Sequence, residues 1–238
     1  MKNEMKNILV FTGAGIDKES GVDTFRDSKD GLWNNFKVED VATLDGWYRD
    51  KEKVLGFYNN YRAKLKDIQP NLAHKIIAEL EKDFNVTVVT QNVTNLHEVA
   101  GSRKVIHLHG ELYKSQSTLD SSLTYECKDD IKIGDKCERG YQLRPHVTWF
   151  GEDLDSDKLL QAERAAKDCD ICIIIGTSMQ VAPANMIPFM CKETALIYYV
   201  DPSDRDFNLP RLRDHFFYHI AEPATTGIKR VYDELITL

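Results

Sequence analysis

The sequence predicts an α/β protein, a doubly wound, Rossmann-like parallel sheet with a smaller, mostly helical second domain. Short apolar runs alternate with segments of helical periodicity along the 238 residues, and several of the runs end in small polar residues. Such alternation is typical of βαβ units, whose parallel strands are buried on both faces. We expect residues 1–30, 73–110 and 144–238 to form the large domain. Residues 31–72 and 111–143 are expected to form the small inserted domain.

Composition and charge indicate a folded globular protein that must hold small acidic partners through local contacts. Hydrophobic residues make up 42% of the chain, and 31 Lys and Arg against 38 Asp and Glu give a net charge of −7. Because no basic tail or stripe is present, we expect no nucleic-acid and no membrane partner. The first apolar run is too short for a signal peptide, and the odd count of five cysteines favours a reducing compartment. We therefore expect a cytoplasmic protein.

The first strand-to-helix crossing carries a glycine-rich stretch. The apolar run Asn7–Thr12 leads into the stretch TGAGIDKESGVDTFRD, which covers residues 12–27. Closely spaced Gly13 and Gly15 before a short helix would let backbone N–H groups approach a phosphate, although a plain tight turn is the alternative. Phe25 and Arg26, at the end of the stretch, could cover and clamp a charged ligand.

Two helices with an amphipathic period follow. We expect one helix over Gly46–Ile68 and a second over Leu72–Lys82, with Asn71 as the N-cap of the second. Both helices are expected to serve as scaffold. His74 is interpreted as a surface or packing histidine.

The next apolar run, Val86–Thr90, predicts a central strand, and Gln91 and Asn92 stand directly after it. Amides at the carboxyl end of a parallel strand can hydrogen-bond ribose hydroxyls or a carboxamide without adding charge. A polar helix cap at the end of the strand is an equally good interpretation.

A histidine pair marks the end of the strand predicted over Lys104–Leu108. His109 stands at the mouth of this strand before a glycine, which suits general-base chemistry near neutral pH. His107 and His109 could also be a pair of metal ligands. No set of carboxylates or cysteines at metal-ligand spacing flanks them.

Two later strands also end in small polar or acidic residues. The run Ile171–Ile175 ends in Gly176, Thr177 and Ser178, which suit the far phosphate or ribose of a dinucleotide. Ala195–Val200 ends in Asp201, whose carboxylate can accept hydrogen bonds from ribose hydroxyls.

These motifs together resemble the sirtuin family over about residues 7–236. The resemblance rests on the glycine-rich stretch and on TQNVTNLH, HLHG and LRPHVTWFGE, which occur in family order. Three positions depart from the family pattern: Asp17 replaces a serine, Asp23 a proline and Thr94 an aspartate.

The resemblance implies an NAD-dependent protein-lysine deacylase that yields nicotinamide, deacylated lysine and O-acyl-ADP-ribose. It implies catalytic roles for His109, which would deprotonate a ribose hydroxyl, and for Asn92. The residues that it implies for NAD binding are Gly13, Ala14, Gly15, Ile16, Phe25, Arg26, Gln91, Asn92, Gly176, Thr177, Ser178 and Asp201. Those implied for the acyl-lysine protein or peptide substrate are Tyr58, Val147, Phe150, Gly151, Glu152 and Val181.

The acyl preference is predicted from one helix. Sirtuins that accept succinyl or malonyl groups pair a tyrosine with an arginine three residues later. Here Tyr58 is followed by Tyr61 at that position, and Arg62 is one residue, or about 100° of helix rotation, too late. We expect a preference for neutral acyl groups.

The family's zinc ribbon is incomplete. Only Cys127 and Cys137 lie between Gly110 and Arg144, so we expect no metal, with hydrophobic packing or the turn over residues 133–135 in its place. The pair Cys169 and Cys172 is expected to lie in the core.

The remaining departures raise two questions about the site. A carboxylate at Asp17 is expected to repel a dinucleotide phosphate, so that Asp17→Ser would tighten NAD binding. Alternative functions are an NAD hydrolase or ADP-ribosyltransferase, and a non-catalytic module that binds NAD or ADP-ribose. The sequence makes no prediction of oligomeric state.

Overall fold

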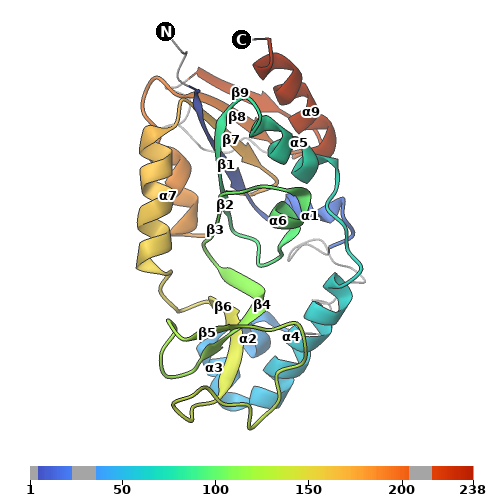
Figure 1. The fold of residues 1–238 in the computed structure, drawn as a ribbon, viewed down its shortest axis with the longest axis vertical. Coiled ribbons are helices and arrows are strands. Elements are labelled where there is room, and N and C mark those ends of the chain that lie inside the picture. The colour runs from blue at the N-terminus through green and yellow to red at the C-terminus, as the bar shows by residue number, and fades with distance from the viewer. Residues whose placement is uncertain (1–4, 23–35, 204–215, 238) are drawn as a thin grey trace.

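The computed structural model describes residues 5–22, 36–203 and 216–237, and its strands form two sheets. The parallel sheet has the order β3-β2-β1-β7-β8-β9, and the antiparallel sheet the order β5-β4-β6 (Figure 1). The strands are β1 (Asn7–Thr12), β2 (Asn85–Thr90), β3 (Val105–His107), β4 (Gly110–Ser117), β5 (Thr124–Glu126), β6 (Leu143–Val147), β7 (Ile171–Ile175), β8 (Leu196–Val200) and β9 (Phe216–Ile220). The helices are α1 (Ala14–Lys18), α2 (Val38–Val41), α3 (Leu44–Arg49), α4 (Lys51–Leu65), α5 (Leu72–Leu80), α6 (Leu96–Ala100), α7 (Ser156–Asp168), the 3₁₀ helix η2 (Ala184–Met190) and α9 (Ala224–Leu235). The predicted doubly wound α/β fold is confirmed.

Strand β1 lies at the centre of the parallel sheet, where the strand order reverses. It pairs in parallel with β2 on one side and β7 on the other, with Thr12 opposite both Thr90 and Ile175. The chain builds outward from β1 first through β2 and β3 and later through β7, β8 and β9. Ligands of open α/β sheets bind at such a reversal, beyond the carboxyl ends of the strands.

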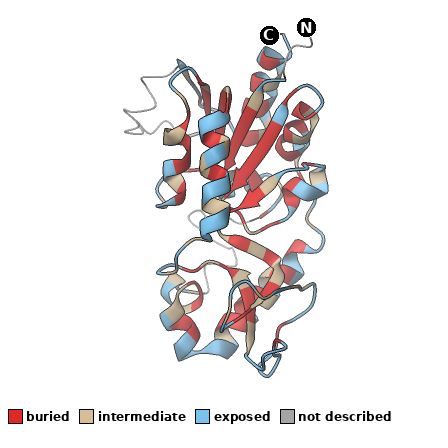
Figure 2. Cartoon of the chain, turned by 60° about the vertical axis from the view of Figure 1, so that its left-hand side comes forward, coloured by how far each residue is buried: buried red, intermediate tan, exposed pale blue. Residues whose placement is uncertain are grey.

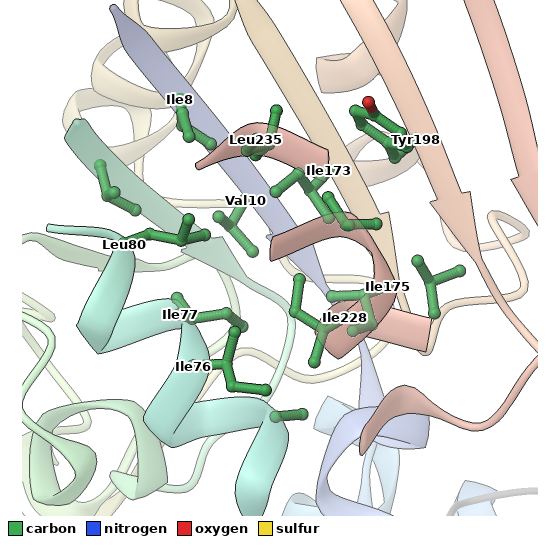
Figure 3. Close-up of a cluster of buried hydrophobic side chains, with 14 of the residues drawn as sticks. Ile8, Val10, Ile76, Ile77, Leu80, Ile173, Ile175, Tyr198, Ile228 and Leu235 are labelled. Carbon is green, nitrogen blue, oxygen red and sulfur yellow. The ribbon is translucent and has the colours of Figure 1, made fainter. Parts of the chain in front are cut away.

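Helices cover both faces of the parallel sheet, which explains its nearly continuous apolar strands. On one face α5 and α9 pack on the sheet, and Ile77 and Ile228 are completely buried there (Figure 3). On the other face α7 and η2 bury a second cluster, which includes Phe11 and Ile174. Figure 2 shows buried residues running along the strands, with exposed residues on the outer surfaces of the helices.

Capping residues set the ends of the scaffold helices. Asn71 caps α5 as predicted, because its Oδ1 accepts hydrogen bonds from the backbone N–H groups of Ala73 (2.9 Å) and His74 (3.4 Å). The single helix predicted over residues 46–68 is wrong. Asp50 has a non-helical ψ of 86° and caps α4 by accepting from the Lys53 N–H, so α3 and α4 are separate helices.

The antiparallel sheet and α2 to α4 lie together at the end of the molecule opposite the termini (Figure 1). This second part is less helical than the sequence predicted, since β4, β5 and β6 cross it. Strand β6 pairs with β4, so residues 143–147 lie with the small sheet. The predicted domain boundaries remain a prediction.

Two side chains of α4 hold the segment in which sirtuins carry zinc. Arg62 Nε donates to the Leu112 carbonyl at 3.0 Å, and its Nη1 donates to the Asp129 carbonyl at 3.2 Å. Asn59 exchanges two hydrogen bonds with the backbone of Ile131, at 2.9 and 3.0 Å. These hydrogen bonds hold the segment against α4. Among the described residues, no three His, Cys, Asp or Glu side chains are grouped to hold a metal ion.

None of the helices within residues 5–22, 36–203 and 216–237 has both the length and the apolar character needed to cross a bilayer.

Candidate active site

The ends of β1, β2 and β7 are tied together at the carboxyl edge of the parallel sheet. The Gly15 N–H donates to the Gly176 carbonyl at 2.8 Å, and the Gln91 N–H donates to the Thr12 carbonyl at 2.9 Å. The Gln91 side-chain amide donates to Thr177 Oγ1 at 3.0 Å. The three polar clusters that the sequence singled out therefore meet at one edge.

The glycines at this edge allow the two strand ends to touch. A Cβ on Gly13 would lie 2.7 Å from Thr177 Cβ, and a Cβ on Gly15 would lie 2.7 Å from Gly176 Cα. Gly176 has φ +63°, and a Cβ there would lie 2.3 Å from the Ile16 nitrogen. The glycines thus let the ends of β1 and β7 pack closely at the strand-order reversal, which is where open α/β sheets bind dinucleotides.

Asn92 is held from three sides. Its Nδ2 donates to the Gly13 carbonyl (3.0 Å), and its backbone N–H donates to Thr90 Oγ1 (3.0 Å). Its carbonyl accepts from His107 Nδ1 (3.0 Å). These bonds fix the turn after β2 against the turn after β1. Asn92 therefore has the fixed position that a ligand-contacting residue needs.

His109 has the hydrogen bond that a general base needs. Its Nδ1 lies 2.9 Å from the Gln91 carbonyl, which can only accept, so Nδ1 carries the proton and Nε2 keeps a free electron pair. Burial lowers the pKa of His109 below its ordinary value, and the bond to Gln91 opposes this shift. His109 is thus held as a neutral ring whose Nε2 can accept a proton.

The His107 ring differs from His109 in its hydrogen bonds, because both of its nitrogens face acceptors. Its Nδ1 faces the Asn92 carbonyl at 3.0 Å, and its Nε2 faces the Glu98 carboxylate at 2.7 Å. Burial, the largest single cause, lowers the pKa of His107, but the bond to Glu98, the Glu98 charge, the Asn92 carbonyl and the Glu111 charge together outweigh it, and the net pKa is raised. Both ring nitrogens are donors here, so the geometry does not support the interpretation of His107 and His109 as a pair of metal ligands.

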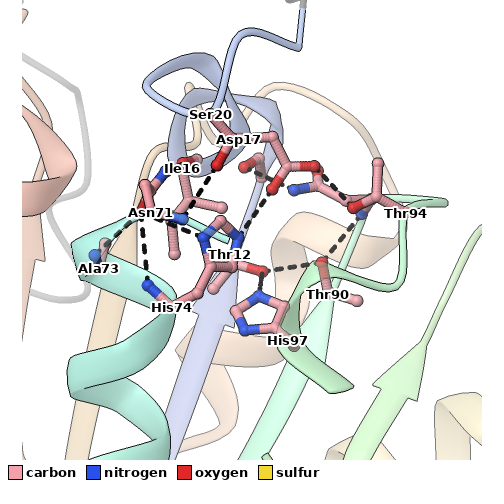
Figure 4. A network of polar contacts seen from close by, with 12 residues as sticks. Thr12, Ile16, Asp17, Ser20, Asn71, Ala73, His74, Thr90, Thr94 and His97 are labelled. Carbon is pink, nitrogen blue, oxygen red and sulfur yellow. Dashed lines mark hydrogen bonds and ion pairs between the residues drawn. The ribbon is translucent and has the colours of Figure 1, made fainter. Parts of the chain in front are cut away.

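Asp17 does not lie as the repulsion argument assumed. Its side chain is buried, with the residue 2% exposed, and its carboxylate accepts from Thr94 Oγ1 at 2.7 Å and from His74 Nε2 at 3.0 Å (Figure 4). The premise that this carboxylate faces a phosphate is wrong, because both of its oxygens have protein partners. His74 is buried with a specific partner, so it is a packing histidine and not a surface one.

The far side of the edge is made by the ends of β7 and β8. Thr177 Oγ1 also accepts from the Met179 N–H (3.2 Å), and the Thr177 carbonyl accepts from the Tyr199 hydroxyl (2.9 Å). Ser178 is half-buried beside them. The Asp201 carboxylate accepts from the backbone N–H of Ser203 at 2.9 Å. Phe25 and Arg26, predicted to cover the ligand, lie outside the described residues.

The predicted substrate residue Glu152 is part of a buried clamp. Its carboxylate accepts from Arg144 Nη1 (2.6 Å), Arg144 Nη2 (2.8 Å) and the Trp149 N–H (2.8 Å). The Arg144 guanidinium also stacks on the Trp149 ring, 3.4 Å from its centroid. Glu152 therefore shapes the segment after β6, and its described contacts are all within the protein.

The remaining predicted substrate residues lie near this clamp or across the sheet edge. Tyr58, 2% exposed, accepts from Trp149 Nε1 at 3.0 Å, which joins α4 to the segment after β6. Val147 is buried in β6, whereas Phe150 is 52% exposed and Gly151 has φ +89°. Val181 is half-buried before η2.

Sequence reasoning missed several buried polar residues beneath the edge. Thr12 Oγ1 donates to Thr90 Oγ1 at 2.8 Å and accepts from His97 Nε2 at 3.2 Å. Thr12 and Thr90 stand at the ends of β1 and β2, and this position was the available signal for them. His97 is the last residue of the TQNVTNLH motif, which was the available signal for it.

The fold and the site define a class: a Rossmann-like protein with the dinucleotide-binding edge at the strand-order reversal and a neutral histidine there whose Nε2 can accept a proton. Residues 13–183 match the Sir2 family model. The chain therefore belongs to the Sir2 family, and its predicted resemblance to sirtuins is confirmed.

Curated relatives and solved structures agree with this assignment. The chain is 45% identical over 207 residues to a protein of Helicobacter pylori strain 26695, covering 87% of this chain and 89% of the relative. It is 46% identical over 238 residues to one of Bacteroides thetaiotaomicron, covering 98% and 99%. Both are named NAD-dependent protein deacylase.

Among solved structures, a Sir2 homologue in complex with NAD is similar, with TM-score 0.85 and 36% identity over 98% of this chain and 91% of the other. A mutant Sir2 homologue in complex with ADP-ribose is also similar, with TM-score 0.85 and 37% identity over 99% and 95%.

Proposed function

We propose that this Sir2-family enzyme, an NAD-dependent protein deacylase, removes neutral acyl groups such as acetyl from lysine side chains of proteins. The products would be nicotinamide, deacylated lysine and O-acyl-ADP-ribose. The observation that carries the proposal is His109, whose Nε2 is unprotonated at the edge where Gln91, Asn92 and Thr177 meet. The names of the curated relatives support the same class.

The residues of this edge would divide the work. When bound, NAD supplies a ribose carbon that releases nicotinamide and takes up the acyl oxygen. The turns after β1 (residues 13–16) and β7 (residues 176–178) would hold the dinucleotide, and the Gln91 and Asn92 amides would orient its ribose.

His109 Nε2 would accept a proton from a ribose hydroxyl. Because burial lowers its pKa, the ring is neutral and ready at physiological pH. A positioned base of this kind contributes about 10²–10⁴-fold to the rate.

The preference for neutral acyl groups is supported by the contacts of Arg62. This side chain is 1% exposed; its Nε donates to the Leu112 carbonyl, its Nη1 donates to the Asp129 carbonyl and to Asn59 Oδ1 at 2.9 Å, and its Nη2 is buried without a hydrogen-bond partner among the described residues. A guanidinium held in this way is not available to an acyl carboxylate. Tyr61 stands where a succinyl-binding enzyme would carry arginine.

An NAD turnover assay tests the function against its alternatives. We expect nicotinamide release with an acetyl-lysine peptide and almost none without it. Release without peptide would favour the NAD hydrolase or ADP-ribosyltransferase, and no release at all would favour the binding module. Desuccinylation faster than deacetylation would contradict the acyl preference alone.

We also propose a cytoplasmic location and a metal-free small domain. All five cysteines are free, as expected in a reducing compartment. Cell fractionation tests the location. Elemental analysis that found one zinc per chain would overturn the metal-free proposal.

A further inference from the structure

Two of the three departures from the sirtuin pattern lie in contact with each other. Thr94 Oγ1 donates to Asp17 Oδ2 at 2.7 Å, although the residues are 77 positions apart in the chain. Both are buried, at 3% and 2% exposure. The family pattern has serine at position 17 and aspartate at position 94. The contact in this chain pairs one hydroxyl with one carboxylate, and the family pattern has the same two groups at these positions in exchanged order.

His74 completes the surroundings of the exchanged carboxylate. Its Nε2 lies 3.0 Å from Asp17 Oδ1, and its Nδ1 lies 3.1 Å from Asn71 Oδ1. The Asn71 amide nitrogen donates to the Ile16 carbonyl at 2.7 Å, which fixes its oxygen as the acceptor. Both nitrogens of His74 thus face acceptors, and both bonds form when the ring carries two protons. Asp17 and His74 therefore form a buried, hydrogen-bonded pair.

A second histidine links this pair to the predicted catalytic turn. The His97 ring lies edge-on to His74, with centroids 4.8 Å apart. Burial, and next the charge of His74, hold the pKa of His97 well below its ordinary value. Neutral His97 donates through Nε2 to Thr12 Oγ1, which donates to Thr90 Oγ1.

The chain of contacts ends at Asn92, whose N–H donates to Thr90 Oγ1. Thr94 lies two residues further along the same turn, so this turn is held at both positions. One end of the network is therefore Asp17 in α1, and the other is the residue expected to orient the ribose.

We infer that Asp17 and Thr94 act as a single positioning unit that holds the turn of residues 91–95 against α1. The site needs one carboxylate and one hydroxyl across this contact, and either arrangement of the two serves. Neither residue is a catalytic residue, because both are buried and act through Asn92. The inference rests on the proposed function for its kinetic readout.

A double-mutant cycle tests the exchange. The proteins are the wild type, D17S, T94D and D17S/T94D, each assayed for kcat and for KM of NAD with saturating acetyl-lysine peptide. D17S leaves His74 without its carboxylate, and T94D places two carboxylates in contact. D17S/T94D restores one of each in the family arrangement.

We expect T94D to lose about 100-fold and D17S about 10-fold in kcat/KM for NAD, while D17S/T94D stays within about fivefold of the wild type. The matched control is D83S/V99D with its single variants, which makes the same charge changes at exposed positions on neighbouring elements. These variants should keep wild-type kinetics.

Three results would overturn the inference. The first is a double variant whose loss equals the product of the two single losses. The second is unchanged kinetics in both single variants. The third is a set of losses that vanishes after correction for the folded fraction, measured by thermal melting of each protein, because the pair would then only stabilise the fold.

The same proteins separate this inference from the proposed function. If the wild type shows no NAD-dependent deacylation, the proposed function fails. The cycle is then measured as ADP-ribose affinity by calorimetry. Recovery of affinity in D17S/T94D would support the positioning unit, and additive losses would refute it.

Discussion

The crevice edge of the parallel sheet and the small part around the antiparallel sheet both bury polar side chains, but with different partners. At the crevice, side chains bond across turns at the ends of different strands, as Gln91 does to Thr177, Thr94 to Asp17 and Asn92 to the Gly13 carbonyl. In the small part, Arg62 and Asn59 bond to backbone groups of the facing segment.

This difference teaches what each set of bonds does. Backbone groups of an irregular segment must be satisfied when buried, so Arg62 and Asn59 replace water and stabilise the fold. Side chains that bond each other at strand ends fix the direction of groups that meet a ligand. Substitutions at the crevice should therefore cost activity, and substitutions in the small part should cost stability.

The strongest test of this division is His109→Gln. We expect kcat to fall about 10²–10⁴-fold, because the amide offers no basic Nε2. The measurement is the deacetylation rate at saturating NAD and peptide. Thermal melting is the control, and a large fall in stability with little loss of kcat would reverse the comparison.

Arg62→Met should have the largest effect on stability. It leaves the Leu112 and Asp129 carbonyls without their donor, and we expect a loss of about 3 kcal/mol in the free energy of unfolding. Urea denaturation measures it. Lys64→Met, at an exposed position on the same helix, is the control and should change little. A loss equal to that of the control would refute the role of Arg62.

Glu152→Gln should cost about 2 kcal/mol in the free energy of unfolding, since buried Arg144 loses its charged partner. The matched control is Glu163→Gln, which removes the exposed i,i+4 pair with Lys167 and should cost almost nothing. Urea denaturation of both variants checks the stability.

The same variant also tests whether Glu152 contributes to binding of the peptide substrate. The KM of the peptide, measured on the folded fraction, tests the predicted substrate role. A raised KM with unchanged stability would place Glu152 with the crevice residues.

The smallest effect is expected from Glu98→Gln, measured as stability against pH. The pKa of His107 in the folded protein is raised above the ordinary 6.5. Its stabilisation is therefore fully present below pH 6.5 and is lost as the pH rises through the folded-state pKa. Because the Glu98 side chain is 40% exposed, the contribution is about 0.5 kcal/mol.

Urea denaturation of wild type and Glu98→Gln between pH 5.5 and 8.5 checks this expectation. The stability difference between the two proteins should shrink as the pH rises. A difference that grows with pH would contradict the charged state of His107.

Strands β1, β2, β3, β7 and β8 and helix α5 could be predicted because their signals are local. The apolar run Ile171–Ile175 is a strand with the predicted bounds, and Asn71 caps its helix as expected. The break at Asp50 was missed because periodicity continues across it, although an aspartate that caps a helix is also a local signal. Strands β4 and β5 were missed because half-exposed antiparallel strands lack a continuous apolar run.

The sequence by itself determined the parallel sheet, the polar strand ends and the membership of the Sir2 family, because apolar patterning and ordered motifs can be recognised without contacts. Only the tertiary structure decided the partners of Asp17, Thr94 and His74. Parallel pairing of β1 and β2 brings Thr12 opposite Thr90, and so brings together turns that are far apart in sequence. Whether a buried carboxylate meets a phosphate or a threonine depends on the direction of its side chain, which no local pattern specifies.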